Sequence, residues 1–255
     1  KHLLDYNIDM AKGYLGEFKD GADRLFKLKY IQYEWLRISL EQARREKGFF
    51  GGMIFWMFND CWPAASGWSI IDYYGIPKAA YYSFKRAAKG VIGSVDLDEK
   101  NGVYKMYVCC DTKPQEVDVR VIKMSKSGSN IQELFNDKVV TSEDRALSVF
   151  ETDKENLEDG EIFILEITDK DGAKDRAFYK SGNLEVIPCD VTVTDKTDEY
   201  IEVTAKKYVH AVEIEGEMIF DDNYFSLLPN EIRRVYYKKV NSMANQIDIC
   251  GYTLK

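Results

Sequence analysis

The chain has 255 residues, 45% of them hydrophobic and 31% charged, and a formal net charge of −8. This composition is typical of a globular protein and excludes a disordered chain, while the negative charge without a basic cluster argues against nucleic-acid and anionic-membrane partners. The longest apolar run, residues 51–58, is too short to span a bilayer.

Residues 22–47 predict one long helix, because apolar residues recur there at helical spacing. The stripe that this spacing predicts consists of Leu28, Ile31, Trp35 and Ile38. Gly48 follows a basic last turn, which is typical of a helix stop. Three glutamates on the same helix lie among Arg and Lys, and we expect all three on its solvated face. They are Glu34, Glu41 and Glu46.

Residues 51–58 are apolar without alternation and begin with two glycines. This pattern predicts a strand buried on both faces, as in a parallel sheet. A second helix is predicted from Pro77 to Lys89, since proline is favoured in a first turn and Gly90 supplies a stop. All four tryptophans lie before the change in composition at residues 90–96, which we interpret as a domain boundary.

The rest of the chain is rich in short strand-like segments separated by turn residues. Their spacing predicts two antiparallel sandwiches. The predicted strands are residues 103–110, 116–124, 146–152, 161–168 and 176–180, then 190–194, 200–205, 211–215, 231–237 and 246–253.

The most informative stretch is W-M-F-N-D-C-W-P, from Trp56 to Pro63. At the carboxyl end of a barrel strand, aromatic faces can stack on a sugar ring while Asn59 and Asp60 bond its hydroxyls. The alternative is that Trp56 is a core residue and that Asn59 and Asp60 only cap the strand.

This stretch resembles the last barrel strand of β-mannosidases in glycoside hydrolase family 2, whose pattern is roughly G-x-L-Y-W-Q-L-N-D-x-W. The similarity continues through W-S-I-I-D-Y-Y-G at Trp68–Gly75 and through Lys78. A second match, F-D-D-N-Y-F-S-L-L-P at Phe220–Pro229, is similar to a stretch of that family's final sandwich. Met57 departs from the family's glutamine, which leaves the exact sugar open.

The resemblance implies α/β plus all-β architecture: the last strand and flanking helices of a TIM (β/α)8 barrel, followed by two immunoglobulin-like β-sandwich domains. The expected domains are an incomplete barrel end at residues 1–92, a sandwich at residues 93–186 and a C-terminal sandwich at residues 187–255. It further implies a retaining exo-glycosidase that acts on terminal β-mannosides and uses no cofactor or metal.

Retaining enzymes need two carboxyl groups about 5 Å apart. In the family both are glutamates on earlier barrel strands, in sequence contexts that this chain lacks. We therefore expect the catalytic residues upstream and the fragment alone to be inactive. The resemblance implies that Trp56 walls the sugar subsite, with Asn59, Asp60 and Trp62 near the site or at its rim.

Three alternatives remain open. One is another family 2 exo-glycosidase, of the β-galactosidase or exo-glucosaminidase type. Another is a non-catalytic carbohydrate-binding module, and the third is a purely structural module that braces the barrel and an oligomer interface. A binding platform in the sandwiches would use Tyr104, Tyr107, Tyr236 and Tyr237.

The five cysteines are widely spaced, odd in number and without a CxxC pair. This pattern argues against a zinc site and favours free thiols in a reducing compartment, hence a cytoplasmic location. An incomplete barrel would leave apolar surface exposed, so we also expect contacts with another copy of the chain or with the rest of the barrel.

Overall fold

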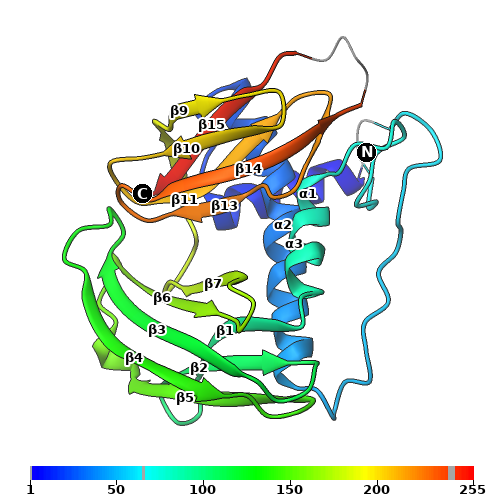
Figure 1. Cartoon of the computed structure of the whole chain (residues 1–255). Coiled ribbons are helices and arrows are strands. Elements are labelled where there is room, and N and C mark those ends of the chain that lie inside the picture. Colours follow the sequence, from blue (N-terminus) through cyan, green and yellow to red (C-terminus); the bar gives the residue numbers. More distant parts are fainter. Residues whose placement is uncertain (1, 65–66, 241–244) are drawn as a thin grey trace. The chain divides into compact units, whose positions relative to one another are not determined.

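The computed structural model describes residues 2–64, 67–240 and 245–255, and it is mostly β-sheet with few helices. The described helices are α1 (His2–Leu15), α2 (Gly21–Arg45) and α3 (Ala79–Ala87) (Figure 1). The chain divides into two compact units. The first comprises Lys1–Trp35, Phe55–Ser83 and Asn183–Lys255, and the second comprises Leu36–Ile54 and Phe84–Gly182.

Helix α2 confirms the long helix predicted at residues 22–47. Its first turn is capped by two carboxylates, because the Asp23 amide donates to Asp20 Oδ1 at 2.9 Å and the Lys19 amide donates to Asp23 Oδ2 at 2.8 Å. This reciprocal arrangement satisfies amides that have no partner within the helix. After the helix ends, Gly48 adopts a φ of 109°, a conformation that side chains other than glycine rarely take.

The predicted apolar stripe of α2 is wrong in part. Ile31 is buried, but Trp35 and Ile38 are exposed, and Leu28 is half-buried. The buried face is instead built on Phe26 and Tyr30, whose rings stack at a centroid distance of 5.3 Å. Phe26 also stacks on Tyr252 with ring centroids 3.4 Å apart, so this face is buried by aromatic neighbours that the large Trp35 ring lacks on its exposed side.

The expectation that Glu34, Glu41 and Glu46 are solvated is wrong for two of them. Glu34 and Glu41 are buried, whereas Glu46 is exposed. A buried carboxylate is tolerated when cations and hydrogen bonds compensate its lost hydration, and Glu41 has this compensation from Arg37 and Arg86.

The second unit contains two antiparallel sheets, in the orders β1-β2-β5 and β4-β3-β6-β7 (Figure 1). Tyr104 of the first sheet lies edge-on to Phe163 of the second, with ring centroids 5.2 Å apart, so the two inner faces share one core. The strands are β1 (Val91–Asp98), β2 (Val103–Cys110), β3 (Glu116–Ser125), β4 (Gln132–Val140), β5 (Arg145–Asp153), β6 (Glu161–Thr168) and β7 (Lys174–Tyr179), with a 3-10 turn at Lys154–Asn156.

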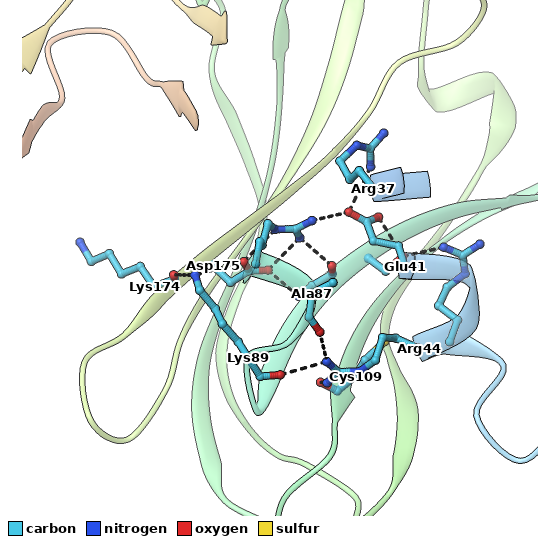
Figure 2. A network of polar contacts seen from close by, with 12 residues as sticks. Arg37, Glu41, Arg44, Ala87, Lys89, Cys109, Lys174 and Asp175 are labelled. Atoms are coloured by element: carbon cyan, nitrogen blue, oxygen red, sulfur yellow. Dashed lines mark hydrogen bonds and ion pairs between the residues drawn. The ribbon is translucent and has the colours of Figure 1, made fainter. Parts of the chain in front are cut away.

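A buried polar network ties the helical residues of this unit to its strands (Figure 2). Arg86 of α3 bonds Glu41 of α2, Asp175 of β7 and the Gly93 carbonyl of β1. Arg44 donates to the carbonyls of Ala87, Lys89 and Cys109, which hold the chain as it passes from α3 into β1 and β2.

The first unit contains two further antiparallel sheets, in the orders β12-β14-β10-β9 and β13-β11-β15-β8. Burial alternates along β10, as expected for a strand with one inward face. The strands are β8 (Val186–Cys189), β9 (Thr192–Lys196), β10 (Tyr200–Thr204), β11 (Val209–Glu215), β12 (Met218–Phe220), β13 (Phe225–Leu227), β14 (Ile232–Lys239) and β15 (Asp248–Leu254).

The second sequence motif, Phe220–Pro229, forms the corner between β12 and β13. Buried Asn223 accepts the Ile214 amide at 2.8 Å and donates to the Ile214 carbonyl at 2.7 Å. Next to it, Tyr224 adopts a φ of 57° and donates its hydroxyl to buried Glu213 at 2.7 Å. The motif is therefore a structural corner of the sheet pair.

The predicted buried strand at residues 51–58 is wrong for this chain. The segment forms no strand and is mostly exposed; Ile54 is 96% exposed. A parallel strand exists only when neighbours supply hydrogen bonds, and apolar composition alone cannot replace them.

No described helix combines the length and the apolar character needed to cross a membrane. Within the described ranges, no three His, Cys, Asp or Glu side chains are grouped so that they could hold a metal ion. The five cysteines are free thiols, of which Cys109 and Cys110 are buried.

Candidate functional site

The segment around Trp56 presents several aromatic side chains to solvent. Trp56 is 77% exposed, Trp62 67% and Trp68 56%, and Asn59 is also exposed. The Trp56–Met57 peptide bond is cis. We call these three tryptophans the aromatic rim. All three belong to the first unit.

Asp60 is placed differently from its neighbours, since its carboxylate is buried and paired. Oδ1 accepts the Ser69 hydroxyl at 2.6 Å, and Oδ2 accepts the Lys78 ammonium at 2.5 Å. Lys78 also donates to the Ser69 oxygen at 2.7 Å, which closes a triangle of three side chains. We call Asp60, Ser69 and Lys78 the polar clamp.

Backbone hydrogen bonds join the same segments. The Asp60 amide donates to the Ile71 carbonyl at 3.1 Å, and the Ile71 amide donates to the Phe58 carbonyl at 3.0 Å. The Lys78 amide donates to the Ile70 carbonyl at 2.9 Å. Strand-like contacts thus bring residues 57–60, 67–71 and 76–78 together around the clamp.

The charges of the clamp determine the titration of Asp60. Burial raises the pKa of its carboxyl, but the hydrogen bonds from Lys78 and Ser69, together with the Lys78 charge, lower it by more. The net pKa lies below its ordinary value, so Asp60 is ionised at neutral pH and unsuited to act as a general acid.

The segment Phe55–Ser83 contains only two carboxylates, Asp60 and Asp72. Asp72 Oδ1 accepts the amides of Tyr74 and Ile76, each at 2.8 Å, and so closes a turn. Both carboxylates have structural partners, and neither is paired with a second carboxylate as retaining hydrolysis requires. What the segment offers chemically is aromatic surface with an exposed amide, which suits binding.

Sequence reasoning missed Ser69 and the role of Lys78. A signal existed for the lysine, because it directly precedes helix α3, where the helix dipole disfavours a cation. A cation at a helix N-terminus therefore indicates a nearby carboxylate partner, and Asp60 is that partner.

The tyrosines considered for a binding platform do not form one. Tyr104 and Tyr237 are buried, and Tyr107 is half-buried. Tyr236 is exposed, but its neighbour Tyr200 lies at an interplanar angle of 69° to it, so the two rings present no flat surface.

Comparison with known proteins points to one family. Residues 186–251 match the Ig_mannosidase family model, an Ig-fold domain. The β-mannosidase B of Thermothelomyces thermophilus is 58% identical over 36 residues, which are 14% of this chain and 4% of that protein. The β-mannosidase B of Neosartorya fischeri is 35% identical over 99 residues, which are 33% of this chain and 12% of that protein.

Solved structures show the same architecture. A β-D-mannosidase from Dictyoglomus thermophilum superposes with a TM-score of 0.81 at 19% identity, over 98% of this chain and 32% of that chain. An exo-chitosanase from Amycolatopsis orientalis gives a TM-score of 0.67 at 15% identity, over 95% of this chain and 35% of that chain. At these identities the likeness concerns the fold.

The predicted resemblance to β-mannosidases, and so to a family of glycoside hydrolases, is confirmed. The chain spans a small part of the curated relatives that it matches, which is consistent with a C-terminal portion of such a protein.

Proposed function

We propose that this chain is the C-terminal portion of a retaining exo-glycosidase that hydrolyses terminal β-mannosides. In this proposal both catalytic glutamates lie upstream, and the chain alone is inactive. The observation that carries the proposal is the exposed aromatic rim in a chain that is similar to β-mannosidases.

We assign the sugar-facing roles to the exposed residues. Trp56 would wall the subsite through its indole face, Trp62 would form the rim, and the Asn59 amide would bond a sugar hydroxyl. The Asn59 amide nitrogen already donates to the Asp60 carbonyl at 3.1 Å, which leaves its oxygen for a hydroxyl donor. Asp60 would support these residues from beneath and would not contact the sugar itself.

The proposal also includes a barrel strand and the bounds of three domains. Residues 51–58 would form the last strand of a (β/α)8 barrel when the upstream strands are present. Support comes from exposed apolar side chains such as Met53 and Ile54, which suit a strand that needs neighbours on both faces. The barrel end would cover residues 1–92, and immunoglobulin-like sandwiches would cover residues 93–186 and 187–255.

We propose a β-mannoside as the substrate because the relatives with similar sequences are β-mannosidases. The likeness to an exo-chitosanase concerns the fold at 15% identity and supports no substrate. The assay described next therefore also tests for exo-glucosaminidase and β-galactosidase activity.

The test uses the longer enzyme that carries this chain and compares aryl β-mannoside, β-glucosaminide and β-galactoside. We expect the mannoside to be hydrolysed fastest, and Trp56→Ala to lower kcat/KM about tenfold or more, which corresponds to ~1.4 kcal/mol. Trp35→Phe, on helix α2, is the matched control and should leave kcat/KM unchanged. Preference for another sugar, or full activity of Trp56→Ala, would contradict the proposal.

A further inference from the structure

The polar clamp lies where it can control the aromatic rim. Asp60 stands between Trp56 and Trp62 in the chain, and Ser69 directly follows Trp68. Gln32 of α2 fixes the same place from another side, since its Nε2 donates to the carbonyls of Trp68 and Ser69 at 3.2 and 3.3 Å. A change in the polar clamp would therefore alter the backbone position of each tryptophan.

The packing around the clamp leaves little space beside Asp60. A Cβ at position 67 would lie 2.9 Å from Asp60 Oδ1, so only glycine fits there without a shift. Ser69 is fully buried and Asp60 nearly so, at 0% and 7% exposure. A sugar hydroxyl would have to displace Ser69 or Lys78 to reach this carboxylate, which argues against direct binding.

The outward placement of the tryptophans needs an explanation. Exposed indoles lose free energy relative to buried ones, so a mobile loop would fold its aromatic side chains onto nearby apolar surface. The described residues instead leave three indoles exposed, while the partly buried Asp60–Lys78 ion pair and two isolated strand bridges hold the backbone next to them.

We propose that Asp60, Ser69 and Lys78 are positioning residues that hold Trp56, Trp62 and Trp68 in fixed outward orientations. The purpose of this ordering, presenting the indoles to a terminal sugar, rests on the proposed function; the ordering itself does not. Pre-ordered aromatic groups bind with a smaller entropic cost than mobile ones. Asp60 thereby acts on a ligand through the rim.

The chain provides its own reporters for this proposal. Its four tryptophans give four indole N–H signals in a ¹H–¹⁵N spectrum, and Trp35 on helix α2 serves as the internal reference. We expect Asp60→Asn and Lys78→Met to lower the ¹H–¹⁵N heteronuclear NOE of the three rim indoles while that of Trp35 stays constant. Lys78→Arg, which retains the charge, should restore most of the order.

A pH titration of the rim indole signals distinguishes positioning by the polar clamp from a general effect on loop stability. Lys78 is the charged side chain that faces Asp60, so its removal should raise the pH midpoint of the rim signals above that of the parent chain. Asp98→Asn removes a half-buried carboxylate paired with Lys105 at 3.0 Å in the second unit, and it should leave the rim signals unchanged. Ser69→Ala supplies a milder variant should either charge variant fail to fold, as judged by amide dispersion.

Two results would overturn the proposal: rim indoles as ordered in Lys78→Met and Ser69→Ala as in the parent chain, or a midpoint that Lys78→Met does not move. Activity of the longer enzyme separates this from the proposed function. If the clamp variants loosen the rim but Trp56→Ala retains full kcat/KM, the clamp is real and the sugar-binding role is wrong.

Discussion

Arg86 binds Asp175 through two parallel hydrogen bonds, from Nε to Oδ1 and from Nη2 to Oδ2, both at 2.8 Å. The same guanidinium reaches Glu41, and Asp175 also accepts the Gly93 amide at 2.8 Å. Such bidentate pairs combine charge with fixed geometry, so they define how helix α3 and strand β7 meet within the second unit.

Arg86→Met should destabilise the chain strongly. It leaves Asp175 buried without its bidentate partner and removes one of the two arginines that pair with Glu41, and breaking a buried pair in this way costs about 3–5 kcal/mol. Urea unfolding followed by far-ultraviolet circular dichroism measures the change. Lys170→Met removes the exposed pair with Asp171 and should cost at most ~1 kcal/mol; equal effects of the two variants would contradict this account.

The network should also make stability depend on acid pH. Burial raises the pKa values of Glu41 and Asp175, but neighbouring cations lower them by more, so both lie below their ordinary values of 4.5 and 3.8. A lowered folded-state pKa contributes stability above the ordinary value and loses it as pH falls through the folded value. The free energy of unfolding should therefore fall as pH drops below these ordinary values.

Glu41→Gln and Asp175→Asn should flatten this acid loss while lowering stability at pH 7. Glu46→Gln, at an exposed position directly after helix α2, should not alter the slope. Urea midpoints between pH 7 and pH 3 provide the measurement, and an unchanged slope in both network variants would show that other carboxylates govern acid unfolding.

Asn223→Ala tests the corner motif. The substitution leaves the amide and carbonyl of Ile214 without partners in a buried position, which costs about 1–3 kcal/mol. Asn136→Ala, at an exposed position where the amide only bonds Glu133, is the control and should change little. A thermal melt in which both variants match the parent would exclude a structural role for Asn223.

Two glycines should respond oppositely to alanine. A Cβ at Gly251 would fall on Val191 Cγ2 and lie 2.9 Å from the Cys189 carbonyl oxygen, so Gly251→Ala should cost about 1–3 kcal/mol. Gly13 lies inside helix α1, where a methyl group added at its Cα would have nothing within 4 Å, and Gly13→Ala should gain about 0.5–1 kcal/mol. Urea midpoints that shift in the same direction would contradict this packing.

Sequence reasoning succeeded where one signal dominated. Apolar residues at helical spacing located α2, and short strand-like segments between turn residues located ten strands. For β2 the predicted bounds, Val103–Cys110, agree with the observed ones. It missed β4, whose side chains are mostly exposed, and β12 and β13, which have three residues each, because neither case produces a hydrophobic period. It also missed α1, β1 and β8.

The candidate site was predictable only as a stretch of sequence. The motif identified Trp56 to Pro63, but the burial of Asp60 depends on Ser69 and Lys78, which approach it through tertiary contacts. The prediction of a buried strand at residues 51–58 failed for a related reason. The apolar composition of this segment suits a strand with neighbours on both sides, but none of the described strands pairs with the segment. Glu41 was misjudged because Arg86, one of its two arginine partners, lies far away in sequence.

The central claim is that this chain contributes a wall of a sugar site and none of its catalytic carboxyl groups. Release of nitrophenol from a nitrophenyl β-mannoside by the purified 255-residue chain tests it most directly. We expect no release above the buffer rate, because the proposed function places both the general acid and the nucleophile upstream of this chain. Turnover by this chain that Trp56→Ala abolishes would contradict the claim.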